Sequence, residues 1–207
     1  MYPDTLAGAK GQGHDAVHSS ESEMAKRIVL LNGTSSAGKT TIARILQRTL
    51  EPRWLDLEFD LFVGMLTDET PGSGPGPGSD DLGHWLADGW YRVVGGLAAA
   101  GFDVLVEDVI LEPYWLDAAI RNLAPFDVTF VAVRCSLEVA VQRETDRGDR
   151  DIGLVTRQFD SVHAGRSYDC EVDTSTMDPQ ACVDAILRVV EEGGVRAIDV
   201  MRRERER

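Results

Sequence analysis

The sequence predicts an α/β fold with a largely parallel β-sheet and right-handed helical crossovers. Short apolar runs rich in leucine and β-branched residues alternate with longer segments of helical periodicity. A glycine-rich turn, GTSSAGKT at residues 33–40, joins the first run to the helical segment that follows it. Because parallel strands need crossover connections, this alternation predicts helices on both faces of the sheet. At 207 residues, the chain is expected to form one domain of ordinary size.

Five short apolar runs are the candidate strands. The run at 27–32, RIVLLN, stops at the glycine-rich turn and has the composition of a buried strand. The run at 53–59 alternates apolar and acidic side chains, which indicates a strand with one buried face. The other three runs lie at 102–110, 126–135 and 170–175. The sheet is therefore expected to have five strands.

Segments of helical periodicity separate these runs. At 39–50 the apolar side chains recur on one helical face, directly after the glycine-rich turn. The segment 81–100 also has helical character. The segment 136–150 begins at Ser136, a good N-cap residue, and becomes densely charged towards its end. The segment 178–194 opens with Asp-Pro and closes on glycine, as helices often do.

The chain divides into three expected parts. Residues 1–25 are polar and aperiodic and are expected to form a disordered leader. Residues 26–195 are expected to form the folded domain, and residues 196–207, which end in RRERER, a charged C-terminal tail. Within the domain, the Gly-, Pro- and Ser-rich stretch 70–81 predicts a loop.

The composition argues against several classes of partner. The formal net charge is −14, whereas a surface that binds nucleic acid or an anionic membrane must be positive, so we expect neither partner. No apolar run reaches the roughly 18 residues of a membrane-spanning helix. The three cysteines have no CxxC spacing and are interpreted as free thiols of a reducing compartment, which predicts a cytoplasmic location. The sequence does not indicate an oligomeric state.

The glycine-rich turn matches the nucleotide-binding pattern G-x-x-x-x-G-K-[ST]. Its glycines let the backbone curl so that N–H groups point at phosphate oxygens, at the positive end of the next helix. Lys39 is expected to reach the outer phosphates, and the hydroxyl of Thr40 to bind Mg²⁺. The alternative is a strand-to-helix turn that merely contains small residues. The candidate residues for binding ATP or GTP are Gly33, Thr34, Ser35, Ser36, Ala37, Gly38, Lys39, Thr40 and Thr41.

Acidic side chains follow two of the predicted strands. Because ligands bind at the carboxyl ends of parallel strands, these acids are candidate site residues. Asp60 suits a general base that accepts the proton of an acceptor hydroxyl, and its alternative role is an ordinary helix N-cap. Asp108, which follows Glu107, suits an outer-sphere partner of Mg²⁺, and its alternative is a solvated turn. Asp56 could line the acceptor site or lie on a solvated face.

Three arginines are candidate residues of a helical lid. Arg143, Arg147 and Arg150 lie on one side of the predicted helix at 136–150. Guanidinium groups carried by a lid can match the charge that develops on the transferred phosphoryl group. The alternative is a surface helix whose arginines pair with acids of the same helix, namely Glu144, Asp146 and Asp149.

The same segments resemble the chloramphenicol 3-O-phosphotransferase family of P-loop kinases. The likeness rests, in order, on RIVLLNGTSSAGKTTIARILQ, EPRWLDLEFD, LVEDVIL, VRCSLEVAVQRETDRGDR and VHAGRSYDCEVDTS. It runs from about residue 27 to about residue 190. The resemblance implies a P-loop kinase fold with a five-stranded, mostly parallel sheet, helices on both faces and a helical lid. It also implies ATP and Mg²⁺ as cofactors.

By position, the resemblance also implies roles for single residues. Asp60 matches the aspartate proposed as base on the primary hydroxyl of the drug, and Asp108 the second member of an acidic pair. His163 matches a family position too, with a helix cap or a core residue as its alternative. Tyr168 and Asp169 are candidates for framing the nucleotide base, or are merely structural.

The sequence departs from the family where the acceptor would bind. The stretches 61–69 and 70–84 differ from the family pattern. We therefore expect an ATP-dependent kinase that acts on a hydroxyl of a small natural product, such as chloramphenicol or an analogue. The alternatives are a metabolic kinase for a nucleoside or a sugar acid, and a non-catalytic nucleotide-binding module.

Overall fold

The computed structural model, which describes residues 27–50, 54–66, 80–148 and 152–207, contains a five-stranded sheet in the order β2-β3-β1-β4-β5. Every neighbouring pair of strands is parallel. The strands are β1 (Arg27–Asn32), β2 (Trp54–Glu58), β3 (Asp103–Asp108), β4 (Asp127–Arg134) and β5 (Cys170–Asp173). The predicted α/β class and the five-stranded sheet are confirmed, and the sheet is wholly parallel.

The central strand β1 is buried on both faces. Ile28 and Leu30 point into one apolar cluster, whereas Val29 and Leu31 point into the other. All four side chains are fully buried. A strand covered on both faces has no need of polar residues between its ends, and for this reason IVLL, at 28–31, is a continuous apolar run.

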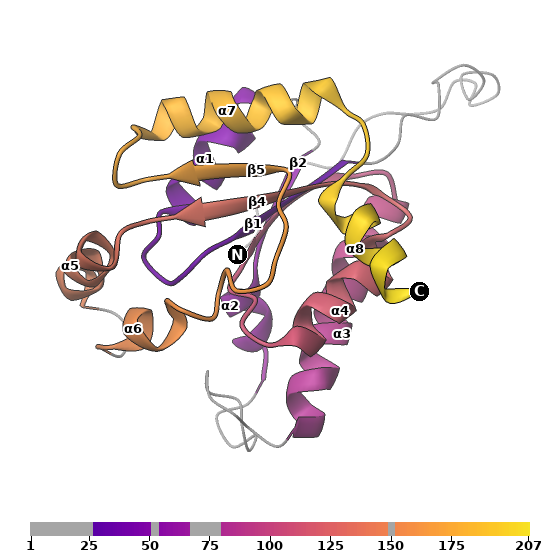
Figure 1. Cartoon of the computed structure of the whole chain (residues 1–207), viewed down its shortest axis with the longest axis horizontal. Coiled ribbons are helices and arrows are strands. Elements are labelled where there is room, and N and C mark those ends of the chain that lie inside the picture. Colours follow the sequence, from indigo (N-terminus) through magenta and orange to yellow (C-terminus); the bar gives the residue numbers. More distant parts are fainter. Residues whose placement is uncertain (1–26, 51–53, 67–79, 149–151) are drawn as a thin grey trace, which may run out of the picture.

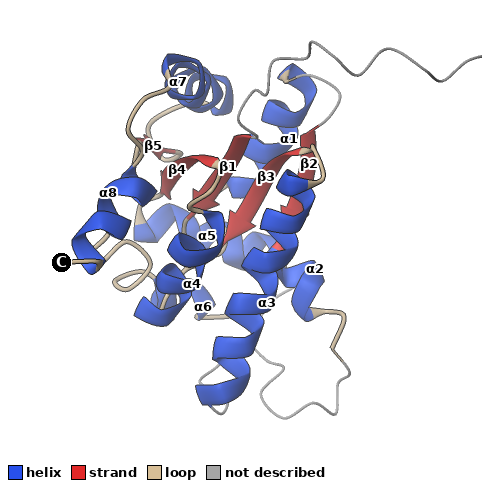
Figure 2. Ribbon diagram, turned by 90° about the vertical axis from the view of Figure 1, so that its right-hand side faces the viewer, coloured by secondary structure: helices blue, strands red, loops and turns tan. Residues whose placement is uncertain are grey.

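Helices cover both faces of the sheet (Figures 1 and 2). One face carries α1 (Lys39–Thr49) and α7 (Pro179–Glu192). The other face carries α3 (Asp80–Ala99), α4 (Pro113–Leu123) and α8 (Ala197–Arg205). Three further helices, α2 (Phe59–Val63), α5 (Leu137–Arg147) and α6 (Leu154–Gln158), lie beyond the carboxyl ends of the strands (Figure 1). The carboxyl edge of the sheet is therefore where loops and short helices surround a candidate site.

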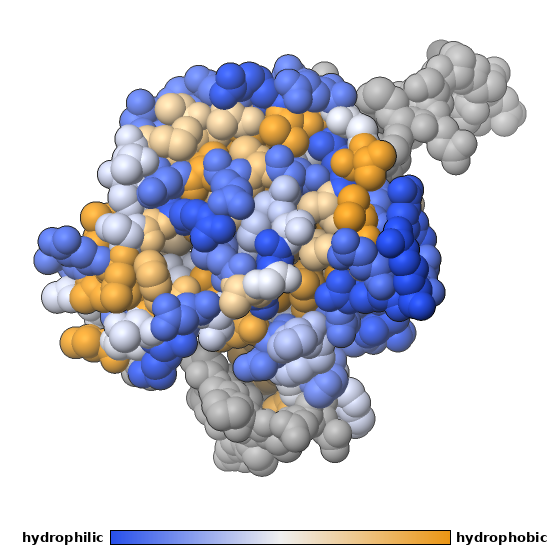
Figure 3. Space-filling view, viewed as in Figure 1, coloured by the Kyte–Doolittle hydropathy of each residue, from blue (hydrophilic) through white to orange (hydrophobic). Residues whose placement is uncertain are grey.

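The segment 196–207, which the sequence analysis treats as a charged tail, contains the helix α8. Ala197, Ile198 and Met201 are buried against the core. The outer surface of this helix is strongly hydrophilic (Figure 3). Although the helix is densely charged, these three residues form an apolar stripe at i, i+1 and i+4, which is enough to pack one helical face against the core.

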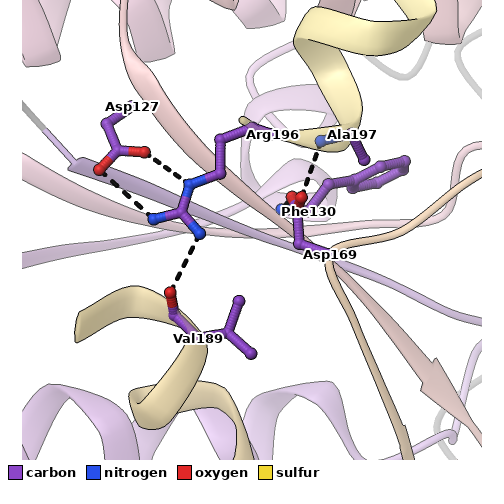
Figure 4. A network of polar contacts seen from close by, with 6 residues as sticks. All are labelled: Asp127, Phe130, Asp169, Val189, Arg196 and Ala197. Carbon is purple, nitrogen blue, oxygen red and sulfur yellow. Dashed lines mark hydrogen bonds and ion pairs between the residues drawn. The ribbon is translucent and has the colours of Figure 1, made fainter. Parts of the chain in front are cut away.

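Two carboxylates attach α8 to the sheet (Figure 4). Arg196, which precedes the helix, donates from Nε to Asp127 Oδ1 over 2.7 Å and from Nη1 to the carbonyl of Val189 over 3.0 Å. Asp169 accepts from the backbone N–H groups of Phe130 and Ala197, both over 2.7 Å. These contacts join β4 and α7 to the start of α8, so the last helix belongs to the fold.

Some expectations fall on residues outside those that the structure describes. They are the leader at 1–25, nearly all of the loop at 70–81, and Arg150. Among the described helices, none combines the length and the apolar character that crossing a membrane requires.

Replacing Arg196 should destabilise the fold. The Arg196 side chain is 5 % exposed and that of Asp127 is 27 % exposed. Arg196→Ala leaves a partly buried carboxylate without its cation, so we expect the free energy of unfolding to fall by about 2 kcal/mol. Urea denaturation measures the change, with Arg203→Ala, an exposed arginine of the same helix, as the control. Equal unfolding midpoints for the two variants would contradict the anchoring role.

Candidate active site

The glycine-rich loop joins the central strand β1 to α1 at the carboxyl edge of the sheet. Gly38 is the N-cap of α1 with φ of 98°, and Ser36, with φ of 59°, is the one non-glycine residue with positive φ in the described part of the chain. A Cβ on Gly33 would lie 2.3 Å from the carbonyl oxygen of Val133, so only glycine allows this approach to β4. The loop therefore has the strand–loop–helix context that a phosphate-binding loop requires.

Lys39 and Thr40 make short contacts within and beside the loop. Lys39 Nζ donates to the carbonyls of Gly33 and Thr34 over 2.8 and 2.9 Å. Thr40 Oγ1 donates to Glu107 Oε2 over 2.7 Å. These contacts hold an ammonium group, a hydroxyl and a carboxylate around the first residues of α1.

Glu107 has the properties of a partner for a cation. Its Oε1 atom is buried and has no hydrogen-bond partner among the described residues. The pKa of Glu107 is raised to about 7, chiefly by burial and also by the charges of Asp56 and Glu58, while the hydrogen bond from Thr40 opposes the rise. The sheet register sets Glu58 directly opposite Glu107 on β3. The accumulated negative charge and the unsatisfied oxygen make a bound cation favourable here.

These oxygens fit Mg²⁺. Mg²⁺ prefers oxygen ligands and is usually held by one or two carboxylates together with substrate phosphates and water. In the described ranges no three His, Cys, Asp or Glu side chains are grouped so that they could hold a metal by themselves. Thr40 and Glu107 are therefore suited to an ion that arrives with the nucleotide.

Asp108 lies on the opposite face of β3 from Glu107 and is bound by three aromatic side chains. Its Oδ2 accepts from Tyr91 Oη over 2.7 Å, Trp90 Nε1 over 3.1 Å and Trp115 Nε1 over 3.4 Å. Burial raises the pKa of Asp108 to about 6, and the hydrogen bonds from Tyr91, Val109 and Trp115 oppose that rise. The structure thus brings Glu107, and not Asp108, to Thr40, because successive residues of a strand point to opposite faces.

The same aromatic group fixes the helix that carries Asp60. Phe59 packs edge-on against Trp115 and Trp90, with ring centroids 4.6 and 5.6 Å apart, and Phe62 lies 5.4 Å from Trp90. Asp60 is exposed in the first turn of α2, just beyond the carboxyl end of β2. The N-cap of α2 is Glu58, so Asp60 does not have the alternative role of N-cap.

The structure describes two of the three predicted lid arginines, and their surroundings differ. Arg143 donates from Nη1 to Thr174 Oγ1 over 2.9 Å and from Nη2 to the Thr174 carbonyl over 3.0 Å. It also reaches the carbonyls of Ser36 and Ala37, over 3.4 and 3.5 Å. Arg147 is exposed in the last turn of α5, and Arg150 lies outside the described residues. Of the two that the structure describes, Arg143 contacts the loop.

Glu144 is buried and does not face solvent beside the arginines. Its carboxylate accepts from the N–H groups of Gly153 and Val155, over 2.8 and 2.9 Å. These backbone hydrogen bonds lower the pKa of Glu144. Glu144 therefore joins α5 to the first turn of α6. The surface-helix alternative, in which Glu144 pairs with arginines of its own helix, does not account for this contact.

Two pockets border opposite ends of the glycine-rich loop. A pocket of about 200 Å³ adjoins the start of α1 and the end of β5; its lining is Gly38, Thr41, Ile42, Arg143, Thr174, Met177 and Pro179. A pocket of about 440 Å³ adjoins the start of the loop and the segment after α6. Its lining is Thr34, Arg134, Cys135, Ser136, Phe159, Asp160, His163, Ala164 and Asp173.

Residues near the end of the family pattern are mostly structural. Asp169 accepts hydrogen bonds from backbone N–H groups of β4 and α8, which is a structural role. Tyr168 Oη accepts from Asn32 Nδ2 over 2.7 Å and lies 2.9 Å from His163 Nδ1. Burial, together with the charge of Arg134, lowers the pKa of His163 to about 4, so its imidazole is neutral. His163 faces the larger pocket, where it can donate or accept a hydrogen bond.

Sequence reasoning missed two residues that contact the loop. Thr174 Oγ1 donates to the carbonyl of Ala37 over 2.7 Å, and Gln158 Oε1 accepts from the N–H of Ser35 over 2.8 Å. Both lie more than 100 positions from the loop, at separations of 137 and 123 residues. No local spacing could have revealed them, although Thr174 stands within the segment that carries the family likeness.

Known proteins resemble this chain in sequence and in fold. Two Mycobacterium tuberculosis proteins, from strains CDC 1551 and H37Rv and both inferred to be O-phosphotransferases, are each 31 % identical over 173 residues. The match covers 72 % of this chain and 75 % of each relative.

Solved structures show the same fold at low sequence identity. The Mycobacterium tuberculosis APS kinase in complex with AMPPNP and APS superposes with a TM-score of 0.64 at 16 % identity, covering 81 % of this chain and 98 % of that one. A sugar kinase from Janibacter sp. HTCC2649 gives a TM-score of 0.63 at 18 % identity, covering 81 % and 95 %. The fold is therefore that of the P-loop kinases.

The family follows from the sequence. The model of the family described as "chloramphenicol phosphotransferase-like protein" matches residues 26–191, which include the loop, the acidic pair and the α5–α6 region. With this match and its P-loop kinase fold, the chain belongs to the chloramphenicol phosphotransferase-like family.

Proposed function

We propose that the chain is an ATP-dependent kinase that transfers the γ-phosphoryl group to a hydroxyl of a small natural product. Chloramphenicol or an analogue is the first candidate acceptor, because the family model carries that name. The observation that supports this function best is the hydrogen bond from Thr40 to Glu107 at the end of the P-loop. In the same loop, Lys39 binds a backbone carbonyl with its ammonium group. A module that only bound a nucleotide would not need a separate acceptor side, which Asp60 and α2 provide. In keeping with the three free cysteines, a cytoplasmic location is part of the proposal.

The loop and its neighbours would hold the nucleotide. Backbone N–H groups of the loop, other than those of Gly33, Ser35 and Ala37, which already donate within the protein, would cradle the phosphates. The smaller pocket beside Arg143 and Thr174 would receive the base. Lys39 exchanges its bonds with loop carbonyls for phosphate oxygens. Mg²⁺, held by Thr40 and with Glu107 as its carboxylate partner, would neutralise charge on the outer phosphates.

The acceptor would be held at α2. Asp60 orients the hydroxyl in line with the γ-phosphorus and accepts its proton late in the reaction, since phosphoryl transfer has a loose transition state. The packing of Phe59 and Phe62 on Trp90 and Trp115 keeps α2 in place for this role. A nucleoside or a sugar acid remains the alternative acceptor, because the residues that surround Asp60 depart from the family pattern.

A screen of acceptors tests the proposed function directly. Purified protein with Mg·ATP should phosphorylate at least one member of a panel of hydroxylated antibiotics, nucleosides and sugar acids, with chloramphenicol included. Mass spectrometry detects the gain of one phosphoryl group, and Lys39→Ala should reduce turnover by a factor of about a thousand or more. No ATP-dependent product from any class would argue for the non-catalytic module.

Substitutions of Glu107 and Asp108 should have different effects on Mg²⁺-dependent ATP binding and on stability. Glu107→Gln should raise the Mg²⁺ concentration needed for half-maximal ATP binding by about tenfold, because a neutral amide attracts the ion less strongly, and stability should not fall. Asp108→Asn should leave that requirement close to the wild-type value but lower the unfolding free energy by about 1–3 kcal/mol, because the aromatic donors lose their shared acceptor. Calorimetric Mg·ATP titration and urea denaturation make the two measurements. The reverse assignment would restore Asp108 as the metal partner.

Asp60→Asn should impair transfer without affecting the nucleotide. General bases contribute about a hundred- to ten-thousand-fold, and a loose transition state places the expected loss of kcat near the lower end. ATP affinity should be unchanged, because Asp60 belongs to α2 and not to the loop. The pH–rate profile should lose its acidic limb if Asp60 is the base, whereas the acceptor KM should rise if orientation dominates. Unchanged kcat and KM would remove Asp60 from the acceptor site.

A further inference from the structure

One backbone N–H group of the P-loop is already bound to a side chain from another element. Ser35 N–H donates to Gln158 Oε1 over 2.8 Å, and both residues are buried, with exposures of 2 % and 6 %. The neighbouring amides of such a loop are directed at phosphate oxygens. Gln158 therefore lies at the wall of the phosphate site, although it belongs to α6.

This contact fixes which way the Gln158 carboxamide points. A backbone N–H can only donate, so the atom that it meets must be the amide oxygen, and Nε2 must occupy the other arm of the planar group. Among the described residues, the Gln158 side chain makes its hydrogen bond through Oε1, to Ser35. Nε2 is not one of the fully buried polar atoms that lack a partner, so it retains contact with open space. Gln158 thus presents an oriented, neutral NH₂ donor next to the loop.

The elements on either side hold Gln158 in this place. Upstream, Glu144 binds the N–H groups at the start of α6, and Leu154 and Val155 are buried. Downstream, Asn32 Nδ2, at the end of β1, donates to the carbonyl of Val162 over 2.8 Å. The segment that carries Gln158 is therefore fastened to α5 at one end and to the root of the loop at the other.

There is space for a ligand beside the contact. The pocket of about 440 Å³ is lined by Thr34 and Phe159, the immediate sequence neighbours of Ser35 and Gln158. This pocket lies at the opposite end of the loop from the smaller one, which we assign to the base. A nucleotide that has its base in the smaller pocket and runs along the loop would bring its terminal phosphate towards Ser35.

We propose that Gln158 is a further residue of the phosphate site, which donates from Nε2 to an oxygen of the terminal phosphoryl group while Oε1 holds the N–H of Ser35. The assignment rests on the proposed function, in that the chain binds ATP. It gives α6 a direct part in distinguishing ATP from ADP, because only ATP carries the group that Nε2 contacts. No nearby charge is needed, since a neutral amide can donate to a phosphate oxygen.

The ratio of ATP to ADP affinity tests the assignment. Gln158→Met keeps the length of the side chain and its neutrality but removes the donor, so the ratio of Mg·ATP to Mg·ADP affinity should fall by about tenfold. Gln158→Glu keeps an acceptor for Ser35 and also removes the donor, so its ratio should fall at least as far. Gln142→Met is the matched control, because Gln142 is an exposed glutamine of α5 that binds Asp146, and its ratio should equal that of the wild type.

The outcomes separate this assignment from the proposed function. Calorimetry with Mg·ATP and Mg·ADP requires no acceptor, so an unidentified substrate does not affect the result. Equal losses of ATP and ADP affinity in Gln158→Met, or a wild-type ratio in Gln158→Glu, would overturn the donor role and leave Gln158 a brace for the loop. Wild-type protein that bound neither nucleotide would overturn the proposed function itself, and the assignment with it.

Discussion

The curled backbone of the P-loop is the constraint on which the rest of the site depends. Positive φ at Ser36 is unfavourable for a residue with a Cβ, by about 1 kcal/mol or more, and such a conformation persists only where its surroundings hold it. Here Thr174 and Arg143 bind the carbonyls on one side of the loop, and Gln158 binds the N–H of Ser35 on the other. The loop is thus held in its curled conformation by α5, by α6 and by Thr174, the residue that follows β5. A site built in this way loses little conformational entropy when it binds its ligand.

A second constraint is the alternation of side chains along β3. Glu107 and Asp108 are adjacent in sequence, yet one meets Thr40 and the other is enclosed by Trp90 and Tyr91. Both carboxyl groups have a raised pKa because both are buried, but their surroundings differ. Asp108 has hydrogen-bond donors for its charge, whereas Glu107 retains an unsatisfied oxygen. Of the two acids, Glu107 is therefore the one that we propose as the partner of a cation.

The sequence sufficed where the decisive interactions are local. The five strands, the α1 helix and the loop were predictable because periodicity, capping and glycine placement act over a few residues. Helix α8 was not predictable, because its few apolar side chains, which include Ile198 and Met201, are followed by the densely charged RRERER. Strand alternation places the two acids on opposite faces, but the sequence could not show which of them faces Thr40, because that depends on how β3 packs in the sheet. Gln158 was beyond sequence reasoning for the same cause: its partner lies 123 residues away.

The two sides of the site are specified by different kinds of interaction. On the proposed nucleotide side, main-chain groups and glycine conformation set the geometry, and these depend little on which side chains surround them. On the proposed acceptor side, the position of Asp60 follows from how Phe59 and Phe62 pack on Trp90 and Trp115. Packing of this kind tolerates exchange of side chains of similar volume, so it can change while the fold and the loop stay the same. For this reason, similarity to the family supports an inference about the reaction class more strongly than one about the identity of the acceptor.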